Sequence, residues 1–235
     1  EQNRVRLCKR QERYIACRRI AEIFLSLFAL ILFFPLFLTI SFLQKLSSPH
    51  ESIFFLQERI GKNGKPFRII KFRTMKSTAP DKVATGDLEN PSLYISRLGA
   101  FLRRTSIDEL PQLINVFKGD MSLIGPRPLI ESETEIQFLR WYYGIYAVPP
   151  GISGLAQVNG RDYVDIYNKV YFDREYTRHI GLLLDMKILV QSVLVVLGHR
   201  GIREGRIDLE ERAVSTMRIQ KIVHEYQEEI LKSAI

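Results

Sequence analysis

Two adjacent carboxylates, Asp108 and Glu109, are the residues of this chain best suited to chemistry. They follow the arginine pair Arg103 and Arg104 and come shortly before a Pro-Arg-Pro turn at residues 126–128. Beside cations, one carboxylate can attack a phosphate or hold a metal ion, while the cations neutralise the phosphate oxygens. This pattern favours chemistry on a phosphorylated substrate.

The same residues also fit a structural role. Ser106 and Glu109 have the spacing of a capping box, in which each side chain satisfies a free backbone N–H at a helix start. Alternatively, Asp108 is itself the N-cap and Pro111 stands at the third helical position, because proline belongs in a first turn. Both interpretations stay open, and a helix N-terminus also favours a bound anion.

Cations elsewhere in the chain provide candidate phosphate contacts. Lys71 and Arg73 share one face of a predicted strand, because strand side chains alternate. Two prolines stiffen the backbone around Arg127, which suits a positioned guanidinium. A turn-rich block at residues 149–161 adds hydrogen-bonding groups from Gln157, Asn159 and Arg161. A solvated strand face and plain turns are the structural alternatives.

Composition restricts the class of partner. The 235 residues carry a formal net charge of +8, which favours anionic partners such as acidic lipids or phosphorylated substrates. Cys8 and Cys17 are the only cysteines, so the sequence offers neither a disulfide framework nor a cysteine-based metal site.

Apolar residues concentrate in an uncharged segment at residues 23–43. It is long enough for a transmembrane helix. However, Pro35 lies just past its middle, where proline removes a helical hydrogen bond and promotes a bend. Cationic residues flank both ends, and such flanks prefer the cytoplasmic side. We therefore predict a re-entrant helix–break–helix that enters one leaflet and returns.

The remaining chain predicts a mixed domain. Apolar runs at residues 53–56 and 66–75, joined by Asn63-Gly64, indicate a β-hairpin. Residues 78–91 are polar and predict a mobile loop, and residues 94–139 have a mainly helical pattern. Residues 182–197 predict a helix that packs on the core or lies at a membrane interface, and a charged amphipathic tail follows residue 206.

Five blocks together resemble the bacterial sugar transferase family in order and spacing. They are the proline-interrupted apolar segment and residues 71–75, 108–122, 125–128 and 150–161. These enzymes are monotopic phosphoglycosyl transferases, which move a phospho-sugar from a nucleotide to a polyprenol phosphate. Two departures are Leu155, where the family often has tryptophan, and Phe34, where serine is frequent.

The resemblance implies a mechanism and site residues. Asp108 is expected to attack the sugar-bearing phosphate of a UDP-sugar, expel UMP and pass the phospho-sugar to undecaprenyl phosphate. Glu109, with Asp108, is expected to hold Mg²⁺. The residues expected to bind substrate phosphates and polar groups are Lys71, Arg73, Arg104, Arg127, Gln157, Asn159 and Arg161.

The predicted fold class is α+β and mostly helical. It comprises a re-entrant membrane helix hairpin at residues 1–48, a small cytosolic catalytic domain at 49–200 and a charged helical tail at 201–235. The catalytic domain is expected to contain a short antiparallel hairpin and interfacial amphipathic helices. Expected partners are the UDP-sugar, undecaprenyl phosphate and the cytoplasmic leaflet of the bacterial inner membrane, with no nucleic acid and with a homodimer allowed. The alternative is a non-catalytic membrane adaptor that binds acidic lipid.

Overall fold

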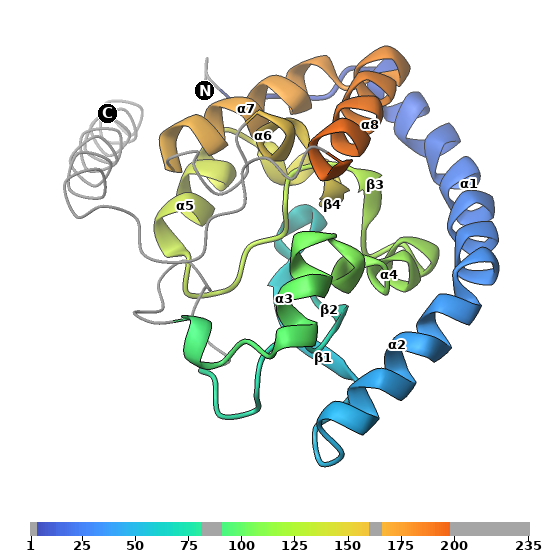
Figure 1. The fold of residues 1–235 in the computed structure, drawn as a ribbon. Coiled ribbons are helices and arrows are strands. Elements are labelled where there is room, and N and C mark those ends of the chain that lie inside the picture. Colours follow the sequence, from blue (N-terminus) through green and yellow to red (C-terminus); the bar gives the residue numbers. More distant parts are fainter. Residues whose placement is uncertain (1–3, 81–90, 160–165, 198–235) are drawn as a thin grey trace.

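Helices form most of the described chain and surround two small β-sheets (Figure 1). The computed structural model describes residues 4–80, 91–159 and 166–197. Its α-helices are α1 (Lys9–Leu32), α2 (Phe34–Ser47), α3 (Arg97–Arg104), α4 (Gln112–Lys118), α5 (Thr134–Tyr142), α6 (Leu155–Val158), α7 (Ile166–His179) and α8 (Leu182–Leu197). Short 3-10 turns are η1 (Lys62–Gly64), η3 (Pro91–Leu93), η4 (Ile107–Glu109) and η5 (Ile145–Ala147). The predicted mostly helical α+β class is confirmed.

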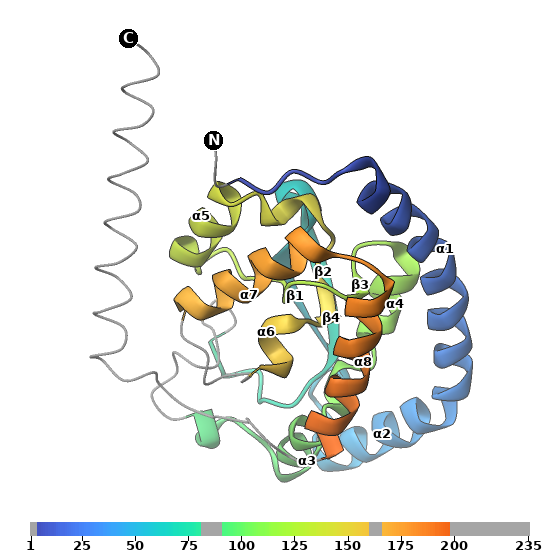
Figure 2. The same ribbon diagram turned by 90° about the horizontal axis from the view of Figure 1, so that it is seen from above.

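A bend separates the first two helices, which form an arc around the other elements in both views (Figures 1 and 2). The break is at Phe33, and the helix axes diverge there by 55°. Pro35 occupies the first turn of α2, where proline is tolerated, so the break falls just before it. The predicted bend is confirmed, and it leaves α1 and α2 end to end rather than side by side.

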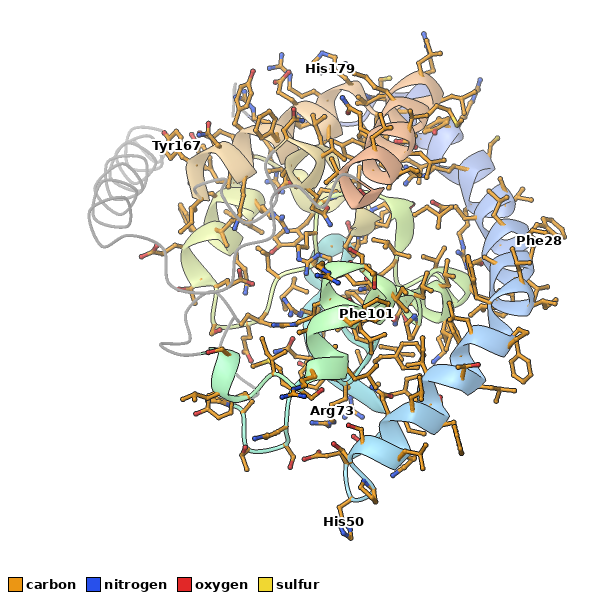
Figure 3. All side chains as sticks on the ribbon, viewed as in Figure 1. Phe28, His50, Arg73, Phe101, Tyr167 and His179 are labelled. Carbon is orange, nitrogen blue, oxygen red and sulfur yellow. The ribbon has the colours of Figure 1, made fainter. Side chains whose placement is uncertain are left out.

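The exposed face of this arc is apolar from Ile20 to Leu46, whereas the first turns of α1 are charged. Phe28 on α1 is 65% exposed and points away from the other elements in Figure 3, and Phe42 on α2 is also exposed. Among the described residues, no single helix has both the length and the apolarity to cross a bilayer, whereas α1 and α2 meet that criterion as a bent pair.

The predicted β-hairpin is present. Strands β1 (Phe54–Ile60) and β2 (Pro66–Phe72) pair antiparallel, and Asn63 and Gly64 both have positive φ in the connecting turn. The first strand is longer than predicted, because residues 57–60 carry mostly polar side chains yet pair through their backbones with β2. The second strand ends at Phe72 rather than at residue 75.

A second sheet was not predicted from the sequence. Strands β3 (Ser122–Ile124) and β4 (Gly151–Ser153) pair in parallel. Three-residue strands are too short to show a period of two, so only the fold reveals them. Their pairing brings the turn at residues 125–128 beside the block that begins at residue 149.

Buried contacts join the arc to the domain. Ile40 of α2 packs in one cluster with Phe72 of β2 and Leu102 of α3. The predicted helix at residues 182–197 is confirmed as α8, and its Ile188 packs in a second cluster with Tyr176 of α7. The predicted loop at 78–91 lies largely, and the tail at 201–235 wholly, outside the described residues.

Candidate active site

The carboxylate pair lies in a tight turn between α3 and α4. Ser106 adopts a left-handed conformation with φ of 56° and makes no capping bond, and the 3-10 turn η4 follows it. Pro111, rather than Asp108, is the N-cap of α4. Both capping interpretations of the sequence are therefore wrong, because the chain turns through η4 before the helix begins.

Glu109 is held by two cations from distant parts of the chain. Lys71 Nζ on β2 lies 2.7 Å from Glu109 Oε1, and Arg127 Nη2 lies 3.1 Å from the same oxygen. The Lys71 and Glu109 side chains are 14% and 18% exposed, whereas that of Arg127 is 47% exposed. Burial alone would raise the pKa of Glu109, but the charges and hydrogen bonds of Lys71 and Arg127 hold it well below its usual range. Glu109 is thus a fixed anion.

Asp108 has a different environment from its neighbour. It is 8% exposed. Burial, followed by the negative charge of Glu109, raises the pKa of Asp108 to about 6, against the opposing charges of Lys71, Arg103 and Arg127. A carboxylate that is buried, costly to ionise and close to three cations suits a nucleophile for an electrophilic phosphate.

Buried arginines support the backbone of the turn that carries Arg127. Arg140 Nη1 donates to the carbonyl oxygen of Arg127 across 2.6 Å, and Arg59 Nη1 donates to that of Pro128 across 3.1 Å. Arg140 is itself paired with buried Asp173 at 2.6 Å. The guanidinium of Arg127 is therefore exposed while its backbone is anchored.

The approach of β4 to this turn requires glycine. A Cβ at Gly151 would lie 2.1 Å from the backbone nitrogen of Gly125, a distance that real Cβ atoms essentially never show. Gly151 N donates to the carbonyl oxygen of Pro126 at 3.0 Å. The two turn-rich blocks of the sequence are thus packed backbone to backbone, because glycine leaves room for this approach.

Other residues predicted to bind substrate lie away from the carboxylates or make internal contacts. Arg73 Nε donates to Ser52 Oγ at 2.9 Å and lies 4.0 Å from Glu51, in an open pocket between α3 and the end of α2 where Figure 3 labels it. Arg104 is exposed at the end of α3.

The amides of the block after β4 bond to nearby backbone carbonyls. Gln157 Nε2 donates to the carbonyl of Ile152, and Asn159 Nδ2 donates to that of Leu155. Arg161 lies outside the described residues. Of the predicted contacts, the structure brings Lys71 and Arg127 together with Asp108 and Glu109.

Sequence reasoning missed two kinds of residue. Arg103, rather than Arg104, lowers the pKa of Asp108. Adjacent helical residues point about 100° apart, so at most one of the pair can face the carboxylate. Arg59 and Arg140 act on backbone carbonyls, and no local sequence signal marks such contacts.

The two carboxylates suit a magnesium ion that is completed by its substrate. Within the described residues, no group of three or more His, Cys, Asp or Glu side chains could hold a metal. Mg²⁺ commonly uses one or two carboxylates, with waters and substrate phosphates as its other ligands. Lys71 and Arg127 both contact Oε1 of Glu109, so Oε2 would be the Glu109 oxygen that could contact the ion.

Comparisons with known proteins show the family of this chain. The family model described as "Bacterial sugar transferase" matches residues 13–199. The chain is 42% identical over 183 residues to the UDP-glucose:undecaprenyl-phosphate glucose-1-phosphate transferase of Escherichia coli strain K12, which covers 75% of this chain and 39% of that protein. It is 35% identical over 198 residues to the exopolysaccharide production protein ExoY of Rhizobium meliloti strain 1021, which covers 78% and 87%.

A third relative is the undecaprenyl-phosphate galactose phosphotransferase of Salmonella typhimurium strain LT2. It is 36% identical over 209 residues, which covers 83% of this chain and 43% of that protein. The chain thus spans less than half of the E. coli and Salmonella relatives, but most of ExoY.

Proposed function

Because this chain belongs to the bacterial sugar transferase family, we propose that it transfers a phospho-sugar from a UDP-sugar to undecaprenyl phosphate and releases UMP. Several relatives are named for reactions of this type. The observation that carries the proposal is the environment of Asp108, a buried carboxylate beside a fixed glutamate and three cations. This step would begin assembly of a bacterial glycan on its lipid carrier.

The reaction proceeds in two displacements at one phosphorus atom. A carboxylate oxygen of Asp108 attacks the sugar-bearing phosphorus of the UDP-sugar, and the bond from this phosphorus to the bridging oxygen breaks. UMP leaves with that oxygen and its electron pair, and a phospho-sugar aspartyl ester remains. A phosphate oxygen of undecaprenyl phosphate then attacks the same phosphorus, which forms the lipid diphosphate sugar and restores the Asp108 carboxylate.

The cations at the site make attack by one anion on another feasible. Lys71 and Arg127 neutralise Glu109 in the absence of substrate, and both lie close enough to Asp108 to affect its ionisation. Arg127 is the more exposed of the two, so its planar fork of donors can contact a diphosphate directly. Lys71 is more deeply buried and keeps Glu109 in place.

We propose Mg²⁺ as the cofactor, held by Asp108 and Glu109 together with substrate phosphates. Its chemistry there would be to neutralise phosphate charge and to stabilise the departing UMP oxygen. Glu109 suits this role because it stays ionised across the physiological pH range.

The bent pair α1 and α2 supports a membrane anchor of the re-entrant kind. Its exposed face is apolar, and basic residues flank both of its ends, as expected for a segment whose two ends lie on the cytoplasmic side. This arrangement would hold the site at the headgroups, where a cytosolic nucleotide sugar and a lipid-linked phosphate can meet. We propose the cytoplasmic face of the inner membrane as its location.

The test is UMP release from a panel of UDP-sugars, each incubated with the purified full chain, Mg²⁺ and undecaprenyl phosphate. We expect UMP to be released from one or a few UDP-sugars. Release over many turnovers should stop when either the lipid or the metal is omitted. A single burst of UMP without the lipid would reveal the aspartyl intermediate. No release from any UDP-sugar would favour the non-catalytic adaptor instead.

A further inference from the structure

A buried side chain, Asn115, bonds to the edge of β2 that faces away from β1. Among the described residues this sheet consists of β1 and β2, and no described strand pairs with β2 on the side that faces away from β1. Asn115 of α4 bonds to that side instead: its Oδ1 accepts from Ile70 N at 3.0 Å, and its Nδ2 donates to the carbonyl oxygen of Arg68 at 2.7 Å. The amide thus makes both bonds that one residue of a neighbouring strand would make.

Asn115 is itself firmly held. Its side chain is almost completely buried, and Nδ2 also lies 3.2 Å from Asp120 Oδ2. Gly119 ends α4 with φ of 97°, a conformation that favours glycine and lets the chain reverse. The backbone nitrogens of Gly119, Asp120 and Met121 then all donate to the carbonyl oxygen of Asn115. Hydrogen bonds therefore fix both the side-chain amide and the backbone carbonyl of Asn115.

This contact joins the two segments that carry the Lys71–Glu109 ion pair. Lys71 directly follows Ile70 on β2, and Glu109 lies in the turn η4 that leads into α4. The pair is 2.7 Å long and partly buried, so a small shift of β2 relative to α4 would break it. Glu109 directly follows Asp108 in η4 and is the residue that Lys71 contacts, which makes the position of β2 relevant to the chemistry.

We propose that Asn115 is a positioning residue that locks β2 to the Asp108–Glu109 turn and thereby sets the geometry of the Lys71–Glu109 pair. It acts through backbone hydrogen bonds and does not touch the substrate. The kinetic part of this inference rests on the proposed transferase function, whereas the structural part does not.

The first experiment replaces Asn115 by Leu, which is similar in size but offers no hydrogen bonds. In the full chain with the UDP-sugar that the wild type turns over, kcat for UMP release should fall by about 100-fold, since misplacement by about 1 Å can cost that much. Lys71→Met should also reduce kcat. Both changes break the same Lys71–Glu109 pair. In protein that already carries Lys71→Met, adding Asn115→Leu should therefore lower kcat by less than about threefold.

Leu113→Ala is the matched control, because Leu113 is also buried on α4, whereas the neighbouring Val116 packs against Ile69 of β2. It should lower the thermal unfolding temperature but combine multiplicatively with Lys71→Met. Asn115→Ala removes the same hydrogen bonds without adding bulk or charge, so it carries the test if the leucine variant does not fold.

Hydrogen–deuterium exchange gives a readout that does not depend on activity. Asn115→Leu or Asn115→Ala should speed exchange in the segment of β2 that contains Ile70, whereas Leu113→Ala should not do so selectively. If wild-type protein releases no UMP but exchange changes as expected, the lock stands and the transferase proposal fails. Folded Asn115 variants with unchanged exchange, or with losses that multiply fully with Lys71→Met, would overturn the positioning role.

Discussion

The guanidinium of Arg140 reaches under the Pro-Arg-Pro turn and donates from Nη1 to the backbone carbonyl of Arg127 across 2.6 Å. The other side of the same guanidinium is paired with Asp173, and both side chains are almost fully buried. A buried ion pair between α5 and α7 therefore supports the turn that presents an exposed phosphate-binding candidate.

Substitutions in the Arg140–Asp173 pair should affect the stability and the activity of the protein differently. Arg140→Leu should destabilise the protein by about 3–5 kcal/mol, because it leaves Asp173 as an uncompensated buried charge. Adding Asp173→Leu should restore much of the stability, since an apolar pair can replace a buried ion pair. Activity should not return, because the carbonyl of Arg127 remains unsupported. Thermal unfolding and UMP release on the three variants check this, and recovery of activity in the double variant would contradict a supporting role.

Asp108→Asn should abolish UMP release and yet stabilise the protein at neutral pH. The folded state raises the pKa of Asp108 from its usual 3.8 to about 6, so ionising it costs folding free energy above that pH. The asparagine amide does not ionise, so the variant avoids this cost in folding free energy, about 1–3 kcal/mol. The folded state binds the Asp108 proton more tightly than the unfolded state does. The free-energy cost of ionising Asp108 in the folded protein therefore grows as the pH rises from about 4 to about 6.

Thermal unfolding at pH 7.5 and pH 4.5 measures this difference. The gain from Asp108→Asn should be larger at pH 7.5. A folded Asp108→Asn variant that still turns over at near wild-type rate would rule out the covalent mechanism.

The ionisation of Asp108 also predicts how kcat/KM depends on pH in the acid range. Only the deprotonated form of Asp108 is a nucleophile, so kcat/KM should rise as pH increases towards about 6 and level off above it. Lys71 lowers the pKa of Asp108, and Lys71→Met should therefore move the limb to higher pH. Steady-state kinetics from pH 4.5 to 8 test both statements. A limb that does not move in Lys71→Met would show that Asp108 is not the group that titrates.

Arg127→Lys should reduce kcat/KM by about 10- to 100-fold, because a lysine loses the planar fork that binds two phosphate oxygens. Stability should change by less than about 1 kcal/mol, since the Arg127 side chain is 47% exposed. Arg178→Lys is a matched control: Arg178 is 49% exposed and pairs with Glu175 on α7. UMP release should be unaffected in the control, and equal effects in the two variants would argue against phosphate binding by Arg127.

Pro35→Leu should straighten the bend between α1 and α2 and favour a full membrane span. Cys8, at the start of α1, is exposed and gives a native site for an impermeant thiol reagent once Cys17 is replaced by serine. In intact spheroplasts Cys8 should be protected in the protein with Pro35 and labelled in Pro35→Leu. Labelling of Cys8 from the periplasmic side with Pro35 present would reject the re-entrant arrangement.

Local backbone chemistry was readable from the sequence. The bend before Pro35, the turn at Asn63-Gly64 and the helix at residues 182–197 each follow from a residue type or a periodicity that acts over a few positions. The ordered motifs likewise identified the family, because their spacing needs no knowledge of contacts.

Only the tertiary structure determined which side chains contact one another at the site. The sequence made Lys71 and Arg73 equivalent, but β2 ends between them, so Lys71 reaches Glu109 while Arg73 bonds to Ser52. It likewise left Arg103 and Arg104 undecided, because which face of α3 meets η4 depends on packing.

The supports of the site were also invisible in the sequence. Asn115 and Arg140 bond to backbone atoms far along the chain, and backbone atoms are the same in every residue. A periodic pattern specifies which face of an element is buried, but it does not specify which distant segment packs against that face. For that reason the sequence indicated which residues are candidates for the chemistry of this protein, whereas the fold determined how they are arranged.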